Sequence, residues 1–219
     1  MKVQRIVSAF VLSFFLTACG ATSVATQQAT LYSTPLSLVV LGDSISAGQY
    51  LPASTDAFPA VLAAELHVQL TVYAKSGNTT AQTRSMYTGA LAPTYAVIEL
   101  GTNDYNRSIP LTTFTEAYNS IVKSIAPATQ VICLSIWDPV NSTDTVWSSP
   151  YHIPSPVNHV GVAPTAYNAM ILQLCRGQYL SIQSIYETAA YHGKGTHSAV
   201  YHPGVAGAEA IARLIYTAL

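Results

Sequence analysis

The sequence predicts an α/β domain with a three-layer α/β/α architecture around a parallel sheet of about five strands. Two observations support this prediction. Apolar, β-branched runs alternate with helix-like stretches from residue 36 to residue 219. The apolar runs are nearly continuous, which is typical of strands that are buried on both faces. Because helical crossovers join such strands, the sheet is expected to be parallel.

The elements follow one another in regular alternation. An apolar run, "LSLVVL", begins the series, and the stretch after it has Asp56 near its start, as a helix often does. Apolar residues in 111–126 recur with helical spacing, and Gly177 marks the end of a later helix. The expected strands are 36–41, 69–74, 95–100, 129–136 and 178–186. The expected helices are 56–68, 79–91, 111–126, 163–177 and 204–219.

The N-terminal residues are expected to be a signal rather than part of the domain. Lys2 and Arg5 precede an apolar stretch that is too short for an ordinary membrane span. The stretch ends in "LTACG", which resembles a bacterial lipobox with Cys19 as the lipidated residue. We therefore expect a lipoprotein signal peptide at 1–19, a flexible tether at 20–35 and the domain at 36–219. The alternative is an ordinary secretory signal in which Cys19 is incidental.

A lipid on Cys19 would tether the domain to a membrane without spanning it, in the periplasm or at the cell surface. Without lipidation the protein would be secreted. An exported protein could pair Cys133 with Cys175, and two separately buried thiols are the alternative. The formal net charge is −1 and no cluster of Lys and Arg is present, so no nucleic-acid partner is expected.

Polar residues stand directly after the expected strands. These are the Asp43-Ser44 pair, "KSGN" at 75–78, "GTND" at 101–104, a long polar segment at 138–162, and "YHPG" at 201–204. Ligands of open α/β sheets bind at the carboxyl ends of the strands. We therefore expect these loops to converge at one edge of the sheet.

Four of these segments resemble the sequence blocks of the SGNH/GDSL hydrolase superfamily. "GDSIS" with Ser44, the glycine of "SGNTT", "GTND" and the terminal "HP" occur in the family order between about 38 and 219. The resemblance implies a flavodoxin-like sheet and hydrolysis of acyl esters, thioesters or sugar-bound acetyl groups. It implies no cofactor, and no spacing of cysteines or histidines indicates a metal site.

Each block has a chemical role in this interpretation. Ser44 would be the nucleophile, and His202 the base that its weakly reactive hydroxyl requires. Attack on a carbonyl places negative charge on its oxygen, which fixed donors must stabilise. The expected donors are the Ser44 N–H, the Gly77 N–H and the Asn103 side-chain amide. Glycine at 77 would let the backbone approach the substrate closely.

Each block also has a purely structural interpretation. Asp43 and Ser44 could cap a following helix, and Asn103 with Asp104 could form an Asx turn. Gly77 could serve a tight turn, and His202 could simply precede a helix. The four blocks together, each after an expected strand, favour the catalytic interpretation. In it, Asp43 supports or caps the site and does not react.

One position departs from the family pattern. The family has an aspartate three residues before the histidine, to orient it, and this chain has Ala199 there. A backbone carbonyl can fix the imidazole tautomer, although it stabilises the imidazolium less. We expect a Ser–His dyad in which the carbonyl of Ala199 orients His202. The alternatives are Glu187 as the orienting acid, or a catalytically degenerate binding module.

The substrate is less well defined by the sequence. Trp137, Trp147 and Tyr151 stand in or beside the long segment at 138–162, which could hold an acyl chain or a sugar ring. Small acyl esters are the expected substrates, and acetylated glycans are the alternative. Four other histidines are expected to contact solvent or substrate rather than a metal. They are His152, His159, His192 and His197. The protein is expected to act as a monomer.

Overall fold

The domain is built on five parallel strands. The computed structural model describes residues 35–136, 160–191, 193 and 202–219. The strands are β1 (Ser37–Gly42), β2 (Gln69–Ala74), β3 (Tyr95–Glu99), β4 (Gln130–Leu134) and β5 (Gln178–Leu180). Their order across the sheet is β2-β1-β3-β4-β5, and every neighbouring pair is parallel. This is the flavodoxin-like order, which confirms the predicted fold class.

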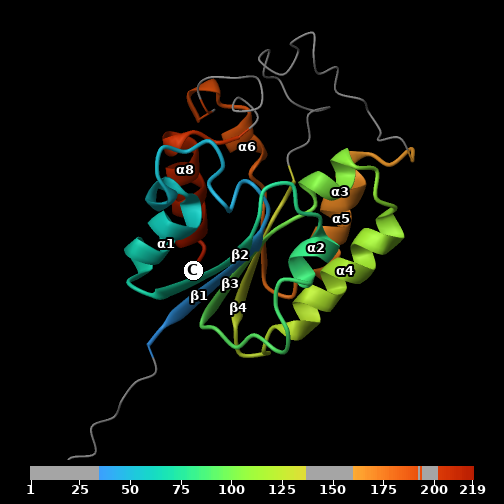
Figure 1. The fold of residues 1–219 in the computed structure, drawn as a ribbon, viewed down its shortest axis with the longest axis horizontal. Coiled ribbons are helices and arrows are strands. Elements are labelled where there is room, and N and C mark those ends of the chain that lie inside the picture. Colours follow the sequence, from blue (N-terminus) through green and yellow to red (C-terminus); the bar gives the residue numbers. More distant parts are fainter. Residues whose placement is uncertain (1–34, 137–159, 192, 194–201) are drawn as a thin grey trace, which may run out of the picture. The chain divides into compact units, whose positions relative to one another are not determined.

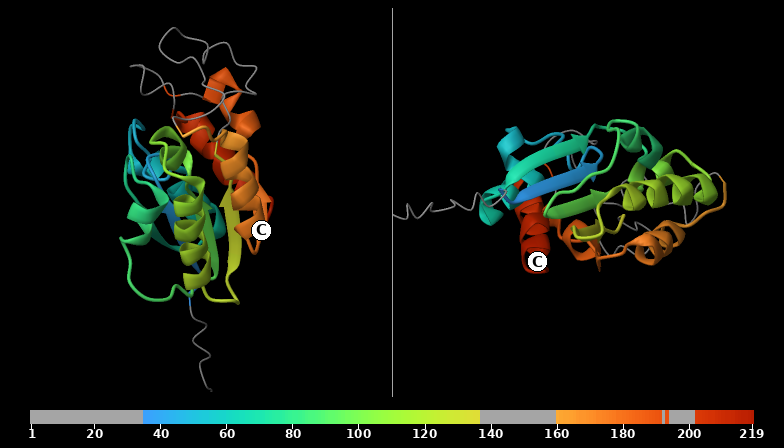
Figure 2. Two further views of the ribbon diagram at one scale, coloured as in Figure 1. Left: turned by 90° about the vertical axis from the view of Figure 1, so that its right-hand side faces the viewer. Right: turned by 90° about the horizontal axis from the view of Figure 1, so that it is seen from below.

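Helices cover both faces of the sheet (Figure 1). One layer contains α1 (Phe58–Leu66), α6 (Gln183–Tyr186) and α8 (Val205–Tyr216). The other contains α2 (Thr80–Arg84), α3 (Thr102–Asn106), α4 (Leu111–Ser124) and α5 (Pro164–Leu174). Short 3-10 helices lie at Ser54–Asp56 and Ala189–Tyr191. Figure 2 shows the same two layers from the side and from below. No helix in the described part of the chain is long and apolar enough to cross a membrane.

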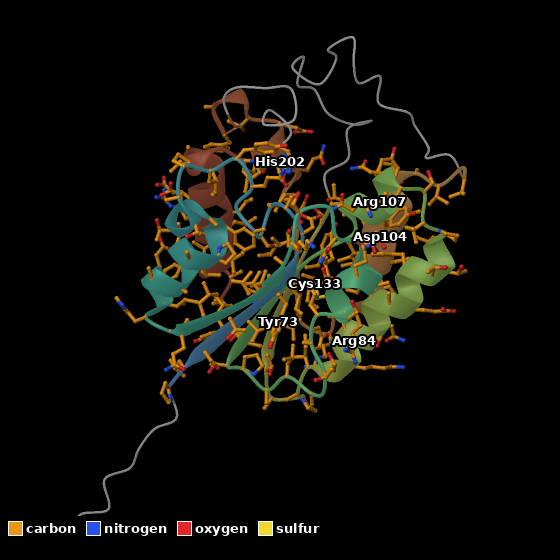
Figure 3. The ribbon with its side chains drawn as sticks, viewed as in Figure 1. Tyr73, Arg84, Asp104, Arg107, Cys133 and His202 are labelled. Atoms are coloured by element: carbon orange, nitrogen blue, oxygen red, sulfur yellow. A yellow bond between two sulfur atoms is a disulfide. The ribbon has the colours of Figure 1, made fainter. Side chains whose placement is uncertain are left out.

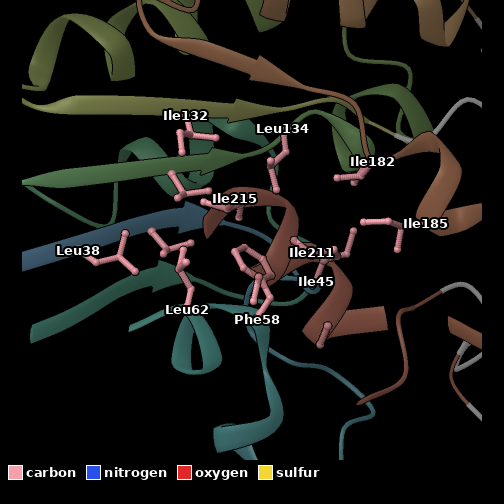
Figure 4. Packing of buried hydrophobic residues seen from close by; sticks show 14 of the residues in the cluster. Leu38, Ile45, Phe58, Leu62, Ile132, Leu134, Ile182, Ile185, Ile211 and Ile215 are labelled. Atoms are coloured by element: carbon pink, nitrogen blue, oxygen red, sulfur yellow. The ribbon is translucent and has the colours of Figure 1, made fainter. Parts of the chain in front are cut away.

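Each face of the sheet has its own apolar core. On the α1/α8 side, Leu38 of β1 packs with Phe58 and Leu62 of α1 and with Ile211 of α8 (Figure 4). On the other side, Phe114 of α4 and Tyr167 of α5 pack against the sheet. Burying one such side chain contributes roughly 1.5–3 kcal/mol. These cores fix the sheet, and thereby the positions at which its loops emerge.

The structure corrects four predictions about the elements. The helix expected at 79–91 is only α2 (Thr80–Arg84), since the chain turns after Arg84 and runs through Gly89 with φ +88°. The strand expected at 178–186 ends at Leu180, and α6 follows it. The segment "GTND" begins the short helix α3 rather than remaining a loop. Strand β2 is an edge strand with exposed residues, so burial on both faces is wrong for it.

Cys133 and Cys175 form a disulfide, which decides between the two alternatives for these thiols. Cys133 is fully buried in β4, and Cys175 follows α5. Their Cα atoms are 6.1 Å apart, and 42 residues separate them in sequence. The bridge therefore ties the end of α5 to β4, an inner strand of the sheet. Helix α5 ends at Leu174, before Gly177, where the helix was expected to stop.

Candidate active site

The nucleophile candidate and the base candidate lie within hydrogen-bonding distance. Ser44 follows β1, and His202 precedes α8. The Oγ atom of Ser44 is 2.9 Å from Nε2 of His202, although 158 residues separate the two in sequence. Figure 3 shows His202 at the end of the sheet where the strands finish. A serine hydroxyl in contact with an imidazole is the arrangement that activates serine nucleophiles.

The turn that carries Ser44 is held by Asp43. The Ile45 N–H donates to Oδ1 of Asp43 over 3.0 Å, and the Gln49 N–H donates to the Ser44 carbonyl over 2.9 Å. Residues 44–50 form hydrogen-bonded turns, and no α-helix begins there. The predicted helix cap is therefore wrong for both residues, and the Asp43 side chain closes the turn instead. The Ser44 side chain contacts His202 instead.

The backbone and the ring of His202 each have a contact of their own. The backbone carbonyl of His202 accepts a 2.8 Å hydrogen bond from the Gly193 N–H. The Tyr50 ring contacts the imidazole edge to face, with centroids 5.0 Å apart. Tyr50 has φ +69°, a conformation that non-glycine residues rarely adopt and that is frequent at functional sites.

The sequence analysis named two groups that could orient His202, the Ala199 carbonyl and the Glu187 carboxylate, and the structure describes one of them. Glu187, at the end of α6, accepts a 2.9 Å hydrogen bond from the Gln183 side chain. Its carboxylate is thus engaged within its own helix. Ala199, whose carbonyl is the preferred candidate, lies outside the described residues.

The three oxyanion-donor candidates come from neighbouring loops. Gly77 follows β2 with φ +77°, and Asn103 lies in α3 after β3. Within the described part of the chain, no hydrogen bond uses the N–H of Ser44 or of Gly77. The Asn103 amide donates one N–H to Oδ2 of Asp43 over 3.0 Å, and an amide nitrogen carries a second hydrogen. These groups can therefore serve a bound oxygen.

Further contacts tie the donor loops together. Asp104 is buried and accepts 2.9 Å hydrogen bonds from both the N–H and the hydroxyl of Thr80, at the start of α2. The Ser76 hydroxyl donates to the Gln49 side chain, which links the Gly77 loop to the Ser44 turn. The Asx turn predicted for Asn103 and Asp104 is not what the structure has, because both side chains bond to other loops.

Buried acids surround the Ser44 turn. Burial raises the pKa of Asp43 to about 6 and raises the pKa of Glu99 well above its ordinary value. Burial also raises the pKa of Asp104, and its hydrogen bonds from Thr80 oppose that rise. The sequence analysis did not identify Glu99. Glu99 is the one acidic residue within the expected strands. A buried acid requires hydrogen-bonding partners, so an acid in a strand expected to be buried on both faces was a signal that could have identified Glu99.

Several predicted residues lie outside the described part of the chain. These are Cys19, Trp137, Trp147, Tyr151, His152, His159, His192 and His197. Most of the segment at 138–162 is outside it as well. One unpredicted residue stands beside Gly77 instead: a Cβ atom on Gly77 would be 3.0 Å from Nη2 of Arg107. Arg107 is exposed at the same end of the sheet as His202 (Figure 3).

Comparison with known proteins gives a consistent family and fold. Residues 40–210 match the sequence model of the GDSL-like lipase/acylhydrolase family. No curated protein matches the chain by sequence. The fold is similar to that of the psychrotrophic esterase EstA from Pseudoalteromonas sp., with 17% identity, a TM-score of 0.58, and 83% of this chain and 95% of that chain covered.

Two further structures extend the comparison. Phospholipase A1 from Streptomyces albidoflavus NA297 has 17% identity and a TM-score of 0.58, with 85% of this chain and 100% of that chain covered. A carbohydrate esterase family 2 enzyme from Corynascus thermopiles has 16% identity and a TM-score of 0.56, with 85% and 67% covered. At these identities the likeness shows a shared fold.

Proposed function

Since the chain belongs to the GDSL-like lipase/acylhydrolase family, and is thus a hydrolase that acts on ester bonds, we propose that it cleaves acyl esters through Ser44 and His202. The observation that carries this proposal is the 2.9 Å contact between Ser44 Oγ and His202 Nε2. The two residues are far apart in sequence, so the contact between their side chains depends on the fold. A hydroxyl–imidazole pair at the edge of an α/β sheet is typical of a nucleophile with its base.

The reaction proceeds in two steps. Ser44 Oγ attacks the ester carbonyl while its proton moves to His202 Nε2. The tetrahedral intermediate then collapses, the alcohol leaves with that proton, and an acyl-serine remains. Water, deprotonated by His202, attacks the acyl-serine, and the acid departs as Ser44 regains its proton. The oxygen that becomes negative in each step receives hydrogen bonds from the Ser44 and Gly77 N–H groups and from the Asn103 amide.

His202 acts as part of a dyad in this proposal. The Ala199 carbonyl accepts from the ring nitrogen that does not face Ser44 and fixes the tautomer. The engagement of Glu187 with Gln183 supports this choice over a carboxylate from α6. The edge contact with Tyr50 restricts rotation of the ring and thereby supplies part of the orientation that an aspartate would give.

Small acyl esters are the proposed substrates, and one observation favours a second class. A structural neighbour is described as a carbohydrate esterase with a carbohydrate binding domain. Removal of acetyl groups from glycans uses the same attack on an ester carbonyl. Both substrate classes occur at a cell surface, where we propose that the signal at 1–19 delivers the protein. The Cys133–Cys175 disulfide supports export, since disulfides persist in oxidising compartments.

Turnover of p-nitrophenyl esters of graded chain length tests the proposal, together with acetate release from acetylated glycans. Ser44→Ala is expected to lower kcat on the order of 10⁴–10⁶-fold. His202→Asn should have a comparable effect. His67→Asn is the matched control, because His67 is exposed at the end of α1, just before β2 begins. Full turnover by Ser44→Ala would refute the proposal, and no turnover of any ester by the wild type would favour a binding module.

The proposed anchor has a separate test. Cys19→Ala should move the protein from the detergent phase to the aqueous phase in a two-phase partition, because the lipid is the proposed membrane contact. Equal partition of both forms into the aqueous phase would contradict lipidation.

A further inference from the structure

Two carboxyl groups lie beneath the turn that carries Ser44. Asp43 is 0% exposed and Glu99, the last residue of β3, is 2% exposed. The Asp43 N–H donates to Oε2 of Glu99 over 3.4 Å, so the two carboxyl groups are buried at the same turn. Two ionised carboxylates buried this close together repel each other, and burial disfavours the charge on both. One of the two groups must therefore keep a proton in the folded protein.

Glu99 is the anchor of the turn. Its Oε2 atom accepts from the Ser46 hydroxyl over 2.8 Å, from the Ser46 N–H over 3.3 Å and from the Asp43 N–H over 3.4 Å. Gly42 makes this approach possible, since a Cβ atom there would be 2.0 Å from Ser46 Oγ and 3.0 Å from Glu99 Oε2. The residues on both sides of Ser44 are thus bound to one buried acid.

Asp43 connects this anchor to the donor loop. Its Oδ2 atom accepts from the Asn103 amide over 3.0 Å, and its Oδ1 atom accepts from the Ile45 N–H over 3.0 Å. Because a carboxylate only accepts hydrogen bonds, this contact fixes which end of the Asn103 side chain is the nitrogen. The second amide hydrogen then has a set direction. The chain Glu99–Asp43–Asn103 therefore runs from the sheet to the proposed oxyanion position.

The groups around the pair favour Glu99 as the residue that holds the proton. Asp104 is the further acid that faces Asp43, and Arg107 faces Asp104. Two buried tyrosines, Tyr118 and Tyr186, also lie within electrostatic reach. Burial raises the pKa of Glu99 well above its usual value, and the charge on Asp43 raises it further. Burial raises the pKa of Asp43 only to about 6, and the Ile45 N–H and the Asn103 amide favour its ionised form. The proton therefore resides on Glu99.

We propose that Glu99 and Asp43 form a one-proton carboxyl pair that positions the Asn103 amide and the Ser44 turn for stabilising the oxyanion. This inference rests on the function proposed above, in which Asn103 contacts the reacting oxygen. Glu99 and Asp43 touch no substrate atom. They are positioning residues, and their effect on turnover passes through Asn103 and the Ser44 backbone.

The test compares two substitutions of Glu99 with one control. Glu99→Gln keeps an acceptor for Ser46 and a donor for Asp43 and imitates the protonated acid. Glu99→Leu has similar bulk and neither hydrogen-bonding group. Glu116→Gln makes the same chemical change on an exposed residue of α4. We expect Glu99→Leu to lower kcat on the order of 10²-fold with little change in KM, as for loss of an oxyanion donor. We expect Glu99→Gln to recover most of that loss.

A spectroscopic titration reports on the proton directly and needs no turnover. Carboxyl ¹³C NMR of the wild type at neutral pH should show one buried side-chain carboxyl in the acid form, and this signal should be absent in Glu99→Gln but present in Glu116→Gln. If every carboxyl is ionised at neutral pH, or if Glu99→Leu turns over like the wild type, the inference is wrong. If the wild type hydrolyses no ester, the proposed function fails, and the titration still decides whether the pair holds its proton.

Discussion

Replacing Gly77 with alanine separates a catalytic backbone donor from a simple turn residue. Gly77 has φ +77°, and Gly89, in the loop after α2, has φ +88°. Both positions are in the left-handed region, where a Cβ atom is unfavourable. Gly89 is exposed in the loop that leads to Leu91, whose backbone pairs with Ile125 after α4. Gly89→Ala is therefore a matched control with the same backbone strain.

The expected loss of stability is similar for the two variants. A left-handed L-residue costs roughly 1–2 kcal/mol. At Gly77 the new Cβ would lie 3.0 Å from Arg107 Nη2, the far end of a flexible side chain that can move. At Gly89 nothing lies within 4 Å of the new atom. For a domain of this size, each kcal/mol lowers the melting temperature by about 2–4 °C.

The expected loss of turnover differs between them. The Gly77 N–H is a proposed oxyanion donor, and losing one such donor costs about 10²–10³-fold in kcat. Gly77→Ala should therefore lower kcat on the order of 10²-fold, while Gly89→Ala keeps the wild-type value. Ester turnover and thermal melting, measured on the same preparations, show whether Gly77→Ala loses activity beyond its loss of stability. Wild-type kcat in Gly77→Ala, with the same melting shift as Gly89→Ala, would refute the assignment of Gly77 as a donor.

Three further predictions concern stability. Reducing the Cys133–Cys175 bridge should lower the free energy of unfolding by about 4 kcal/mol, from the 42-residue separation of the two cysteines, and an unchanged urea midpoint would contradict this. Asp104→Ala leaves the Thr80 N–H and hydroxyl without their buried acceptor and should cost about 1–3 kcal/mol, whereas an unchanged midpoint would show that water replaces it. Stability should also fall as pH rises from about 4 to about 6, because folded Asp43 keeps its proton up to about pH 6 while unfolded aspartate releases it near 3.8. Protonated Asp43 contributes about 3 kcal/mol to the free energy of unfolding below pH 4. Urea titrations that show equal or rising stability from pH 4 to pH 6 would contradict this prediction.

Long apolar runs made most of the fold predictable. All five predicted strands pair in the sheet, and β1, β3 and β4 follow from nearly continuous apolar runs. The segment at 178–186 misled the prediction, since its spaced apolar residues also suit a strand. Ile182, Ile185 and Tyr186 are buried against α8 in a short helix, and a short apolar run does not distinguish a strand from a buried helical turn. Tertiary packing decided that segment.

The position of the site was predictable for a different reason. Parallel strands bring their carboxyl ends to one edge, so polar residues after consecutive strands converge there. The supporting residues were not predictable in this way. Glu99 points back from the end of β3 to Ser46, and Asp104 reaches Thr80 in another loop. Such contacts depend on the order of strands across the sheet, which the sequence pattern alone leaves open.

We propose Ser44 as a nucleophile that His202 activates. Labelling with a fluorophosphonate, followed by mass mapping of the modified residue, tests this claim most directly. We predict a single adduct on Ser44 that is absent in Ser44→Ala, strongly slowed in His202→Asn, and unchanged in Ser54→Ala, which alters an exposed serine. Undiminished labelling of Ser44→Ala, or an adduct on another residue, would contradict the claim.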